Sequence, residues 1–170
     1  MSFDAYMYVG KGKIPAEGET TDSTYKAKKA WEIYSFSMGA SNPCSVGSSS
    51  TGLAAGKVSM SSFNIMKKTD NASPGLFKAC CGGSFWDTAT VVLRKAGGDK
   101  QIEFIMFEFK NVFVESIQWT GSSGGDDTPT ESVSFAFAAV QVTYWPQKDD
   151  GSQGTKNQSN WKVTENVTGF

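Results

Sequence analysis

Residues able to do chemistry are few in this chain, which contains no histidine. Histidine is the commonest general base near neutral pH and the usual partner of serine and cysteine nucleophiles. Three cysteines without histidine do not make up a four-ligand zinc site. We therefore predict that the protein is not an enzyme and has no catalytic residue, metal site or cofactor.

The three cysteines are better explained as ordinary side chains than as reactive thiols. Cys80 and Cys81 are adjacent in a segment with helical spacing, and we interpret both as small buried hydrophobic residues. Cys44 lies in a loop of small residues, and no basic neighbour in the sequence would stabilise its thiolate. An odd number of cysteines fits a chain that folds in the cytoplasm.

Acidic pairs and glycine pairs also occur, at spacings typical of loops. Asp126–Asp127 and Asp149–Asp150 offer oxygen ligands, yet neither matches the spacing of a calcium-binding loop. The glycine pairs at 82–83, 97–98 and 124–125 lack the spacing of phosphate-binding loops. We interpret all of these pairs as parts of solvated loops or turns.

The overall charge is nearly balanced, with 16 basic and 17 acidic residues. No basic block stands out, which argues against a surface for nucleic acid. A near-neutral surface also does little to keep copies of the chain apart. The charge is therefore compatible with self-association, and binding to nucleic acid is not expected.

The hydrophobic pattern predicts a mainly β chain with one short helix, folded as a single domain over residues 1–170. Roughly seven to nine strands are expected, a number typical of a sandwich or barrel. A solvated loop is expected at 10–30, an extended loop at 39–56 and a polar C-terminal tail at 147–170. Alternating apolar residues predict strands at 3–9, 31–38, 57–67, 88–94, 101–119 and 132–144.

The helix is predicted to begin at Ser73, a good N-cap residue, with Pro74 at the first helical position. Gly82–Gly83 is expected to end it. One face of this helix is apolar, and we expect it to be buried. That face consists of Leu76, Phe77, Cys80 and Cys81.

The longest strand pattern, within residues 128–149, changes parity in its middle. Apolar residues alternate up to Phe137 and take the opposite parity from Val140 onwards. A slip of one residue exchanges the two faces of a strand, so Ala138–Ala139 is predicted to be a bulge or a point where the strand changes neighbours. We expect the second half to face another subunit, and its interface candidates are Val140, Val142 and Tyr144.

Targeting and membrane segments are not evident in the sequence. The N-terminus lacks a basic region followed by an apolar core, so we expect no signal peptide. No apolar run approaches the length of a membrane span, so membrane insertion is not expected. The chain is therefore expected to be made and folded in the cytoplasm.

Five motifs, in order along the chain, resemble one protein family. They are FDAYMYV, WEIYSFSMGASNP, GKVSMSSFNIMKKTDNASPGLFKACCGG, TVVLRKAGG and TESVSFAFAAVQVTYWPQKDDGS. Together they resemble the Hcp family, the haemolysin-coregulated proteins of the type VI secretion system. The chain departs from the family pattern at 10–29, which is longer, at 39–56, and after Ser152.

The resemblance implies a small β-barrel of two packed antiparallel sheets with one short α-helix. It further implies that six copies form a ring with a wide pore and that rings stack into a tube. Such a tube is fired from the cell inside a contractile sheath, with a spike protein at its tip and effector proteins in its lumen. The protein would then be secreted without a signal peptide.

Within this picture the sequence suggests three groups of assembly residues. Ser35 and Ser37 are expected to face the lumen, because small hydroxyl side chains keep a bore open and wettable. The segment at 10–29 is expected to decorate the outer wall or the ring rim. The loop at 39–56 is expected to stack rings, through Asn42, Pro43, Cys44, Ser48, Ser49 and Leu53.

Two alternatives remain open from the sequence. A phage-type tail tube protein has the same architecture, although LRKAGG and the SFxF…PQK pattern favour the secretion family. A β-sandwich carbohydrate-binding module would use exposed tryptophans as a stacking platform. That second alternative predicts a monomer.

Overall fold

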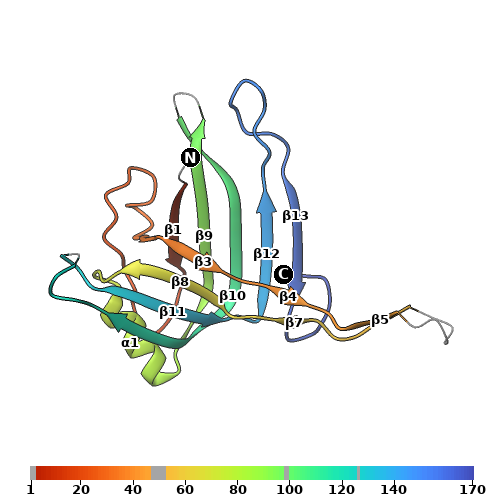
Figure 1. The fold of residues 1–170 in the computed structure, drawn as a ribbon, viewed down its shortest axis with the longest axis horizontal. Coiled ribbons are helices and arrows are strands. Elements are labelled where there is room, and N and C mark those ends of the chain that lie inside the picture. The colour runs from red at the N-terminus through yellow and green to blue at the C-terminus, as the bar shows by residue number, and fades with distance from the viewer. Residues whose placement is uncertain (1–2, 47–52, 98–99, 126) are drawn as a thin grey trace.

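A computed structural model of the protein describes residues 3–46, 53–97, 100–125 and 127–170 (Figure 1). Within these residues the regular structure is mostly strand, with one short helix. The elements in chain order are β1 (Asp4–Val9), β2 (Trp31–Ile33), β3 (Ser35–Ser37), β4 (Ala40–Ser41), β5 (Cys44–Val46), β6 (Leu53–Ala55), β7 (Ser59–Met60), β8 (Phe63–Lys68), α1 (Ser73–Gly82), β9 (Phe85–Gly97), β10 (Lys100–Thr120), β11 (Thr130–Ala136), β12 (Ala139–Tyr144) and β13 (Asn157–Lys162).

The main sheet closes into a barrel. Its strands follow the order β2-β1-β9-β10-β11-β8-β3, and every pairing is antiparallel. Only Tyr34 separates β2 from β3, and its N–H donates to the Met66 carbonyl at 2.8 Å. The two ends of the strand order therefore belong to one nearly continuous segment, which leaves no gap between them. The predicted mainly β barrel with one short helix is confirmed.

The barrel consists of two layers whose strands run in different directions. In Figure 1, β3, β8 and β11 cross the direction of β1, β9, β12 and β13. Strand β10 is long enough to belong to both layers, and it bends near Asn111, whose φ is 50°. Its first half pairs with β12 and its second half with β11.

The predicted change of neighbours near Ala138–Ala139 is confirmed. Strand β11 lies between β10 and β8, whereas β12 lies between β10 and β13. The buried residues of β10 change parity at the same level, from Phe109 to Val112. Because neighbouring strands bend together, the change of parity keeps the buried residues of β11 and β12 in the same hydrophobic core.

This geometry corrects the expected subunit interface. Val140 is 4% exposed and belongs to the same core as Val133 and Phe135, so its side chain does not reach another copy. Val142 is half-buried against that core. Only Tyr144, 46% exposed, is available for a contact between subunits.

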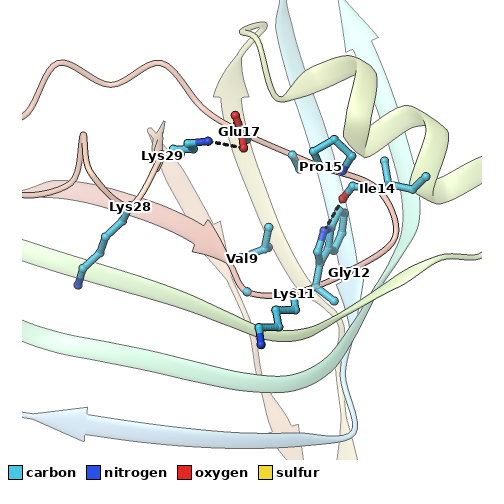
Figure 2. Close-up of a pocket in the computed structure, with 11 residues that line it drawn as sticks. Val9, Lys11, Gly12, Ile14, Pro15, Glu17, Lys28 and Lys29 are labelled. Atoms are coloured by element: carbon cyan, nitrogen blue, oxygen red, sulfur yellow. Dashed lines mark hydrogen bonds and ion pairs between the residues drawn. The ribbon is translucent and has the colours of Figure 1, made fainter.

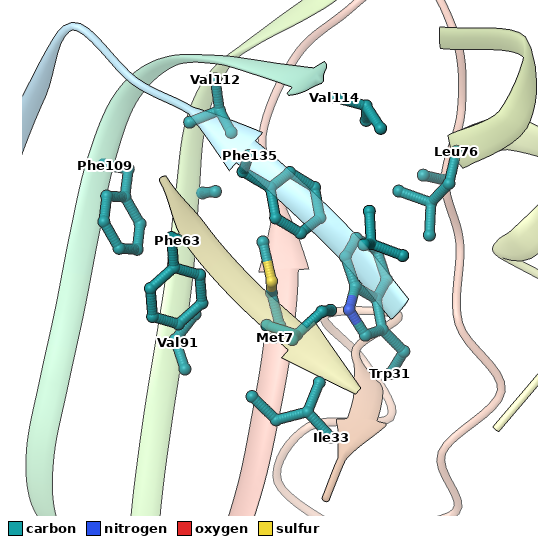
Figure 3. Packing of buried hydrophobic residues seen from close by; sticks show 14 of the residues in the cluster. Met7, Trp31, Ile33, Phe63, Leu76, Val91, Phe109, Val112, Val114 and Phe135 are labelled. Atoms are coloured by element: carbon teal, nitrogen blue, oxygen red, sulfur yellow. The ribbon is translucent and has the colours of Figure 1, made fainter. Parts of the chain in front are cut away.

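The core is aromatic and is closed by the helix at one end. Figure 3 shows Met7, Trp31, Phe63, Phe109 and Phe135 converging on the barrel interior. All five are at most 1% exposed, and the rings of Phe63 and Phe109 lie 4.9 Å apart. Side chains this large, packed from different strands, fix the separation of the two layers.

The helix spans Ser73–Gly82, so it begins at the predicted residue. The cap differs from the prediction: Ala72 is the N-cap residue, and the carboxylate of Asp70 accepts the Ala72 N–H at 2.9 Å. Gly83 ends the helix with φ of 62°, as glycine at this position readily does. Ser73 does not cap the helix because its hydroxyl belongs to a buried polar cluster with Lys67 and Glu131.

The predicted apolar face of the helix was also wrong in part. Leu76 and Ala79 are buried and Cys80 is half-buried, but Phe77 and Cys81 are exposed. In a helix with 3.6 residues per turn the buried stripe runs through 72, 76, 79 and 80. Phe77 and Cys81 are rotated away from this stripe around the helix axis, so their side chains face the solvent.

The segment at 10–29 is not a solvated loop. It crosses the outer surface of β1 and β9, and Ala16, Thr20 and Tyr25 within it are buried. Tyr25 is 0% exposed and stacks on Tyr6 of β1 with the ring centroids 4.6 Å apart. The segment therefore covers part of the barrel wall, and a second small hydrophobic cluster lies beneath it.

Candidate assembly surfaces

Uncharged side chains, polar apart from Met66, line the outer surface of β3, β8, β11 and the second half of β10. They alternate along each strand with buried residues such as Phe63 and Val133. In register they form two rows, Ser35–Met66–Ser132–Gln118 and Ser37–Asn64–Ser134–Ser116. We call these eight residues the polar face.

Hydrogen bonds connect the second row of the polar face. The amide of Asn64 donates to the Ser37 hydroxyl at 3.4 Å, and Ser134 donates to the Asn64 carbonyl oxygen at 2.5 Å. Ser35 and Ser37 are both exposed. The structure thus brings the two serines predicted from sequence together with six residues whose register the sequence did not reveal.

The predicted loop at 39–56 is a two-stranded arm. Strand β4 pairs with β7 and β5 with β6, which extends the ribbon of β3 and β8 away from the barrel (Figure 1). Asn42, Pro43 and Cys44 are exposed, and Leu53 begins β6. Ser48 and Ser49 lie outside the described residues. The arm was taken for a loop because its small residues carry little strand propensity.

The two margins of the polar face differ. Strand β3 pairs with β8 and, among the described strands, has no partner on its other side. Its unpaired edge presents backbone N–H and C=O groups that another strand can bind. At the other margin, Val114–Thr120 of β10 has β11 as its only strand partner within the described chain, and α1 lies beside it. The Cys80 thiol donates to the Glu115 carbonyl at 3.7 Å, and the rings of Phe77 and Trp119 lie 5.6 Å apart.

A pocket of 310 Å³ lies between the end of β1 and the segment at 10–29 (Figure 2). Trp86 donates its indole N–H to the Ile14 carbonyl at 2.8 Å, and Lys29 pairs with Glu17 at 2.5 Å. The first contact ties the segment to the barrel, and the second joins the two ends of the segment. Because the Lys29–Glu17 pair in its wall is exposed and neutralises itself, we interpret this pocket as structural.

A buried ion pair, not foreseen from sequence, joins α1 to the barrel. Lys67 of β8 and Glu131 of β11 are both 0% exposed, with Nζ and Oε1 2.6 Å apart. The Lys67 ammonium also donates to Asp70 at 2.7 Å and to Ser73 at 3.2 Å. The indole N–H of Trp119 donates to Glu131 at 2.7 Å. The charges are therefore paired and hydrogen-bonded, as burial requires.

A second polar cluster holds the segment at 10–29 in place. The guanidinium of Arg94 lies beside the stacked rings of Tyr6 and Tyr25, 4.7 and 4.9 Å from their centroids, and pairs with Asp22 at 2.5 Å. Burial, together with the hydrogen bond to Glu103, raises the pKa of Tyr25. Tyr25 is therefore a neutral hydrogen-bond donor at physiological pH.

Asp22 is expected to make stability depend on pH. Burial acts to raise the pKa of this carboxyl, but the hydrogen bonds donated by Arg94 and by two backbone N–H groups lower it below the reference value of 3.8. A lowered pKa in the folded state stabilises the fold above that reference value, and the stabilisation disappears as pH falls through the folded pKa.

Asp22→Asn should therefore lower the free energy of unfolding by about 1–3 kcal/mol at neutral pH. The difference from the unmodified protein should shrink as pH falls below 3.8. Urea titrations at a series of pH values measure both quantities, and Asp87→Asn, at an exposed position, serves as the control. A difference that stays constant across this range would contradict the assignment.

The remaining candidate chemistry gives no site in the described part of the chain. Cys44 and Cys81 are exposed and Cys80 is half-buried. No group of three or more cysteine, aspartate or glutamate side chains converges there as metal ligands would. The one described helix is too short to cross a membrane.

The tryptophans do not form a stacking platform. Trp31 and Trp86 are buried, and Trp145 and Trp161 are half-buried. Only Trp119 is exposed, at 42%. A carbohydrate-binding strip of exposed tryptophans is therefore not supported.

The model of one protein family, described as "Type VI secretion system effector, Hcp", matches residues 6–144. The protein belongs to the Hcp family. It is 40% identical over 112 residues to Protein hcp1 of Pseudomonas aeruginosa, a match that covers 65% of this chain and 68% of that relative. The resemblance seen in the sequence motifs is thus confirmed, and the chain is a type VI secretion system protein.

Solved structures agree with this Hcp assignment. A structure titled as a type six secretion system protein superimposes with a TM-score of 0.89 at 34% identity, over 99% of this chain and 100% of that one. Hcp1 from Salmonella typhimurium gives a TM-score of 0.78 at 24% identity, with 99% of both chains covered. At that lower identity the second likeness shows the fold alone.

Proposed function

We propose that this Hcp protein is the tube subunit of its secretion system and acts as a structural component rather than an enzyme. Six copies close into a ring, rings stack into a tube, and the tube is expelled from the cell with effector proteins in its lumen. The observation that carries the proposal is the polar face, bordered by the unpaired edge of β3 on one side and by the end of β10 with α1 beside it on the other.

The exposed area of the protomer supports assembly. A compact monomer of this mass exposes about 8,100 Å², whereas this chain exposes 10126 Å². The excess, about 2,000 Å², is comparable to the area that a standard protein–protein interface removes from solvent. The protomer therefore has surface that another copy would cover.

Ring closure is proposed to use the two margins of the polar face. A ring needs a heterologous contact, in which two different patches of each copy meet. The β3 margin and the Val114–Thr120 edge of β10 are two such patches, because they lie on opposite sides of one face. Tyr144 stays a candidate for a further contact between subunits.

The polar face is proposed to line the lumen, with Ser35 and Ser37 among the residues that contact effectors. Their hydroxyls, with Asn64 and the serines of β10 and β11, hydrogen-bond to varied partners without closing the bore. These eight residues carry no charge, and the exposed side chains of Glu115 on β10 and Lys68 on β8, of opposite sign, lie beside them.

Ser37→Gln should weaken effector retention about tenfold or more while leaving rings intact, because six longer side chains would crowd the bore. Co-purification of a co-expressed effector measures retention, and gel filtration measures ring formation. Ser37→Ala is the matched control, since it removes the hydroxyl without adding bulk. Failure of Ser37→Gln to form rings would place Ser37 in an interface instead.

Stacking of rings is proposed to involve the arm, with Asn42, Pro43, Cys44, Ser48, Ser49 and Leu53 as the candidates from sequence. The other proposed partners are a spike protein at the tube tip and the contractile sheath around it. The protein would reside in the cytoplasm before firing and outside the producing cell, or in a target cell, afterwards.

Negative-stain electron microscopy of the purified protein tests the proposal. Rings with an open centre are expected, together with short stacks at high concentration. A monodisperse monomer would reject the tube subunit and favour a binding module. Phage-type tail tubes share this architecture, and the family match favours the secretion system.

A further inference from the structure

Two exposed phenylalanines lie side by side beyond one end of the polar face. Phe85 of β9 and Phe113 of β10 are directly paired, with their ring centroids 5.1 Å apart. They are 48% and 40% exposed. Phe113 pairs on its other side with Ala136, which follows Ser134 on the same face of β11. The aromatic pair therefore continues the polar face by one row, at the β10 margin.

The arm leaves the barrel in that same row, at the opposite margin. Gly39 donates its N–H to the Ser61 hydroxyl at 2.8 Å and accepts the Ser61 N–H at 2.9 Å. These contacts follow the Ser37–Asn64 pair directly along the ribbon. Each protomer thus carries an arm on the β3 side and an aromatic pair on the β10 side, at one level.

We propose that the base of each arm lies on the Phe85–Phe113 pair of the next copy in the ring. The inference rests on the proposed ring, in which the β3 margin of one copy faces the β10 margin of its neighbour. An arm that continues β3 at the level of the aromatic pair then passes over the neighbour's pair. The occupant of the aromatic surface is therefore a second copy of this chain.

The chemistry of the two surfaces is complementary. Among the described residues of the arm, from Ala40 to Val46 and from Leu53 to Met60, the one charged side chain is that of Lys57. Its exposed residues are small or rigid, such as Ala40, Pro43 and Ala55, and lose little side-chain entropy when they pack on aromatic rings. A notch of 470 Å³ beside Phe85 extends the surface.

Covering these surfaces would benefit both elements. A two-stranded ribbon is marginally stable by itself in water, and β4–β7 and β5–β6 have no further strand partner in the described chain. The exposed aromatic pair is the kind of apolar patch that marks an interaction site. The contact would also use part of the surface that the protomer exposes in excess of a compact monomer.

The double variant Phe85→Ser/Phe113→Ser tests the proposal. Its ring should dissociate at a protein concentration at least about 100-fold higher than the ring of the unmodified protein, since buried aromatic anchors dominate interfaces. Light scattering coupled to gel filtration measures the mass across a dilution series. Thermal unfolding of dilute protein should be nearly unchanged, because both side chains are exposed.

Val167→Ser is the control. Val167 is an apolar residue exposed to a similar extent, at 45%, and it pairs with Lys162 of β13, which is not a strand of the polar face. This variant should form rings like the unmodified protein. If Val167→Ser dissociated the ring as strongly as the double variant, the loss would reflect general surface hydrophobicity and the proposal would be overturned.

A complementation experiment tests whether the arm and the pair touch each other. An armless variant, with 42–58 replaced by Asn-Gly, retains the aromatic pair, whereas the double variant retains the arm. Mixed together, they should give a dimer of twice the protomer mass, because each mixed pair restores one contact. No dimer above the level of either variant alone would overturn the proposal.

The outcomes separate this inference from the proposed function. A monomeric unmodified protein would reject the ring and with it the inference. Rings of unmodified protein together with undiminished rings of Phe85→Ser/Phe113→Ser would reject the aromatic contact and leave the tube subunit standing.

Discussion

Lys67→Met is expected to lower the free energy of unfolding by about 3–5 kcal/mol. The substitution removes the ammonium that neutralises Glu131, and it leaves a carboxylate that is 0% exposed without its cation. Asp70 and Ser73 lose a partner at the same time. Urea denaturation at fixed protein concentration measures the change, because assembly would otherwise add to stability.

Two further variants separate the loss of the buried ion pair from other effects of the substitution. Lys68→Met changes the neighbouring, exposed lysine and should cost less than about 1 kcal/mol. Lys67→Met/Glu131→Met removes both buried charges and should recover much of the lost stability, as apolar replacement of buried pairs does. A double variant no more stable than the single one would show that Trp119 and Ser73 need the carboxylate itself.

Tyr25→Ala is expected to destabilise the fold by a similar amount, about 3–5 kcal/mol, as for other large buried aromatic residues. Tyr25 is 0% exposed, stacks on Tyr6 and donates to Glu103 at 2.5 Å. Its loss opens a cavity beneath the segment at 10–29 and removes one of the two aromatic rings near the Arg94 guanidinium. Thermal and urea unfolding measure the effect.

The matched control is Tyr34→Ala, at a tyrosine that is 57% exposed, where the change should be small. If Tyr25→Ala were equally mild, the segment at 10–29 would be a decoration, as expected from its sequence. Under the present structure, deletion of the whole segment should expose Tyr6 and Val92 and yield insoluble or unfolded protein rather than an altered ring.

The two polar clusters have different consequences for assembly. Lys67 and Glu131 hold the helix against β8 and β11, two of the four strands that carry the polar face. Asp22 and Arg94 hold the segment at 10–29 on the opposite, outer side of the barrel. Acid below pH 3.8 should therefore loosen the outer cover through Asp22.

The sequence by itself determined the class of fold and the family. Strict alternation, as in Val133 and Phe135 against Ser132 and Ser134, shows that a strand has one buried face, because side chains of a strand alternate between its faces. The change of parity near Ala138 also predicted a new neighbour correctly. Both patterns involve residues close together in the sequence, so they can be recognised without knowledge of the fold.

Tertiary structure decided which surfaces meet. Val140 was assigned to a subunit contact from its parity, but neighbouring strands bend together, and the residue stays in the core. Ser73, a good cap by sequence, is engaged by Lys67 and Glu131 from distant strands. Tyr25 looked solvated among lysines, yet Tyr6 and Arg94 lie beneath it. In each case long-range contacts overrode a local preference.

The assembly surfaces show the same division. Sequence picked out Ser35 and Ser37 by their small size, but only register places them in rows with Met66 and Asn64. Phe85 and Phe113 are 28 positions apart and adjacent through antiparallel pairing. Pairing between strands joins residues whatever their distance along the chain, so no local pattern contains it, and the closed barrel alone sets which side chains share an outer face.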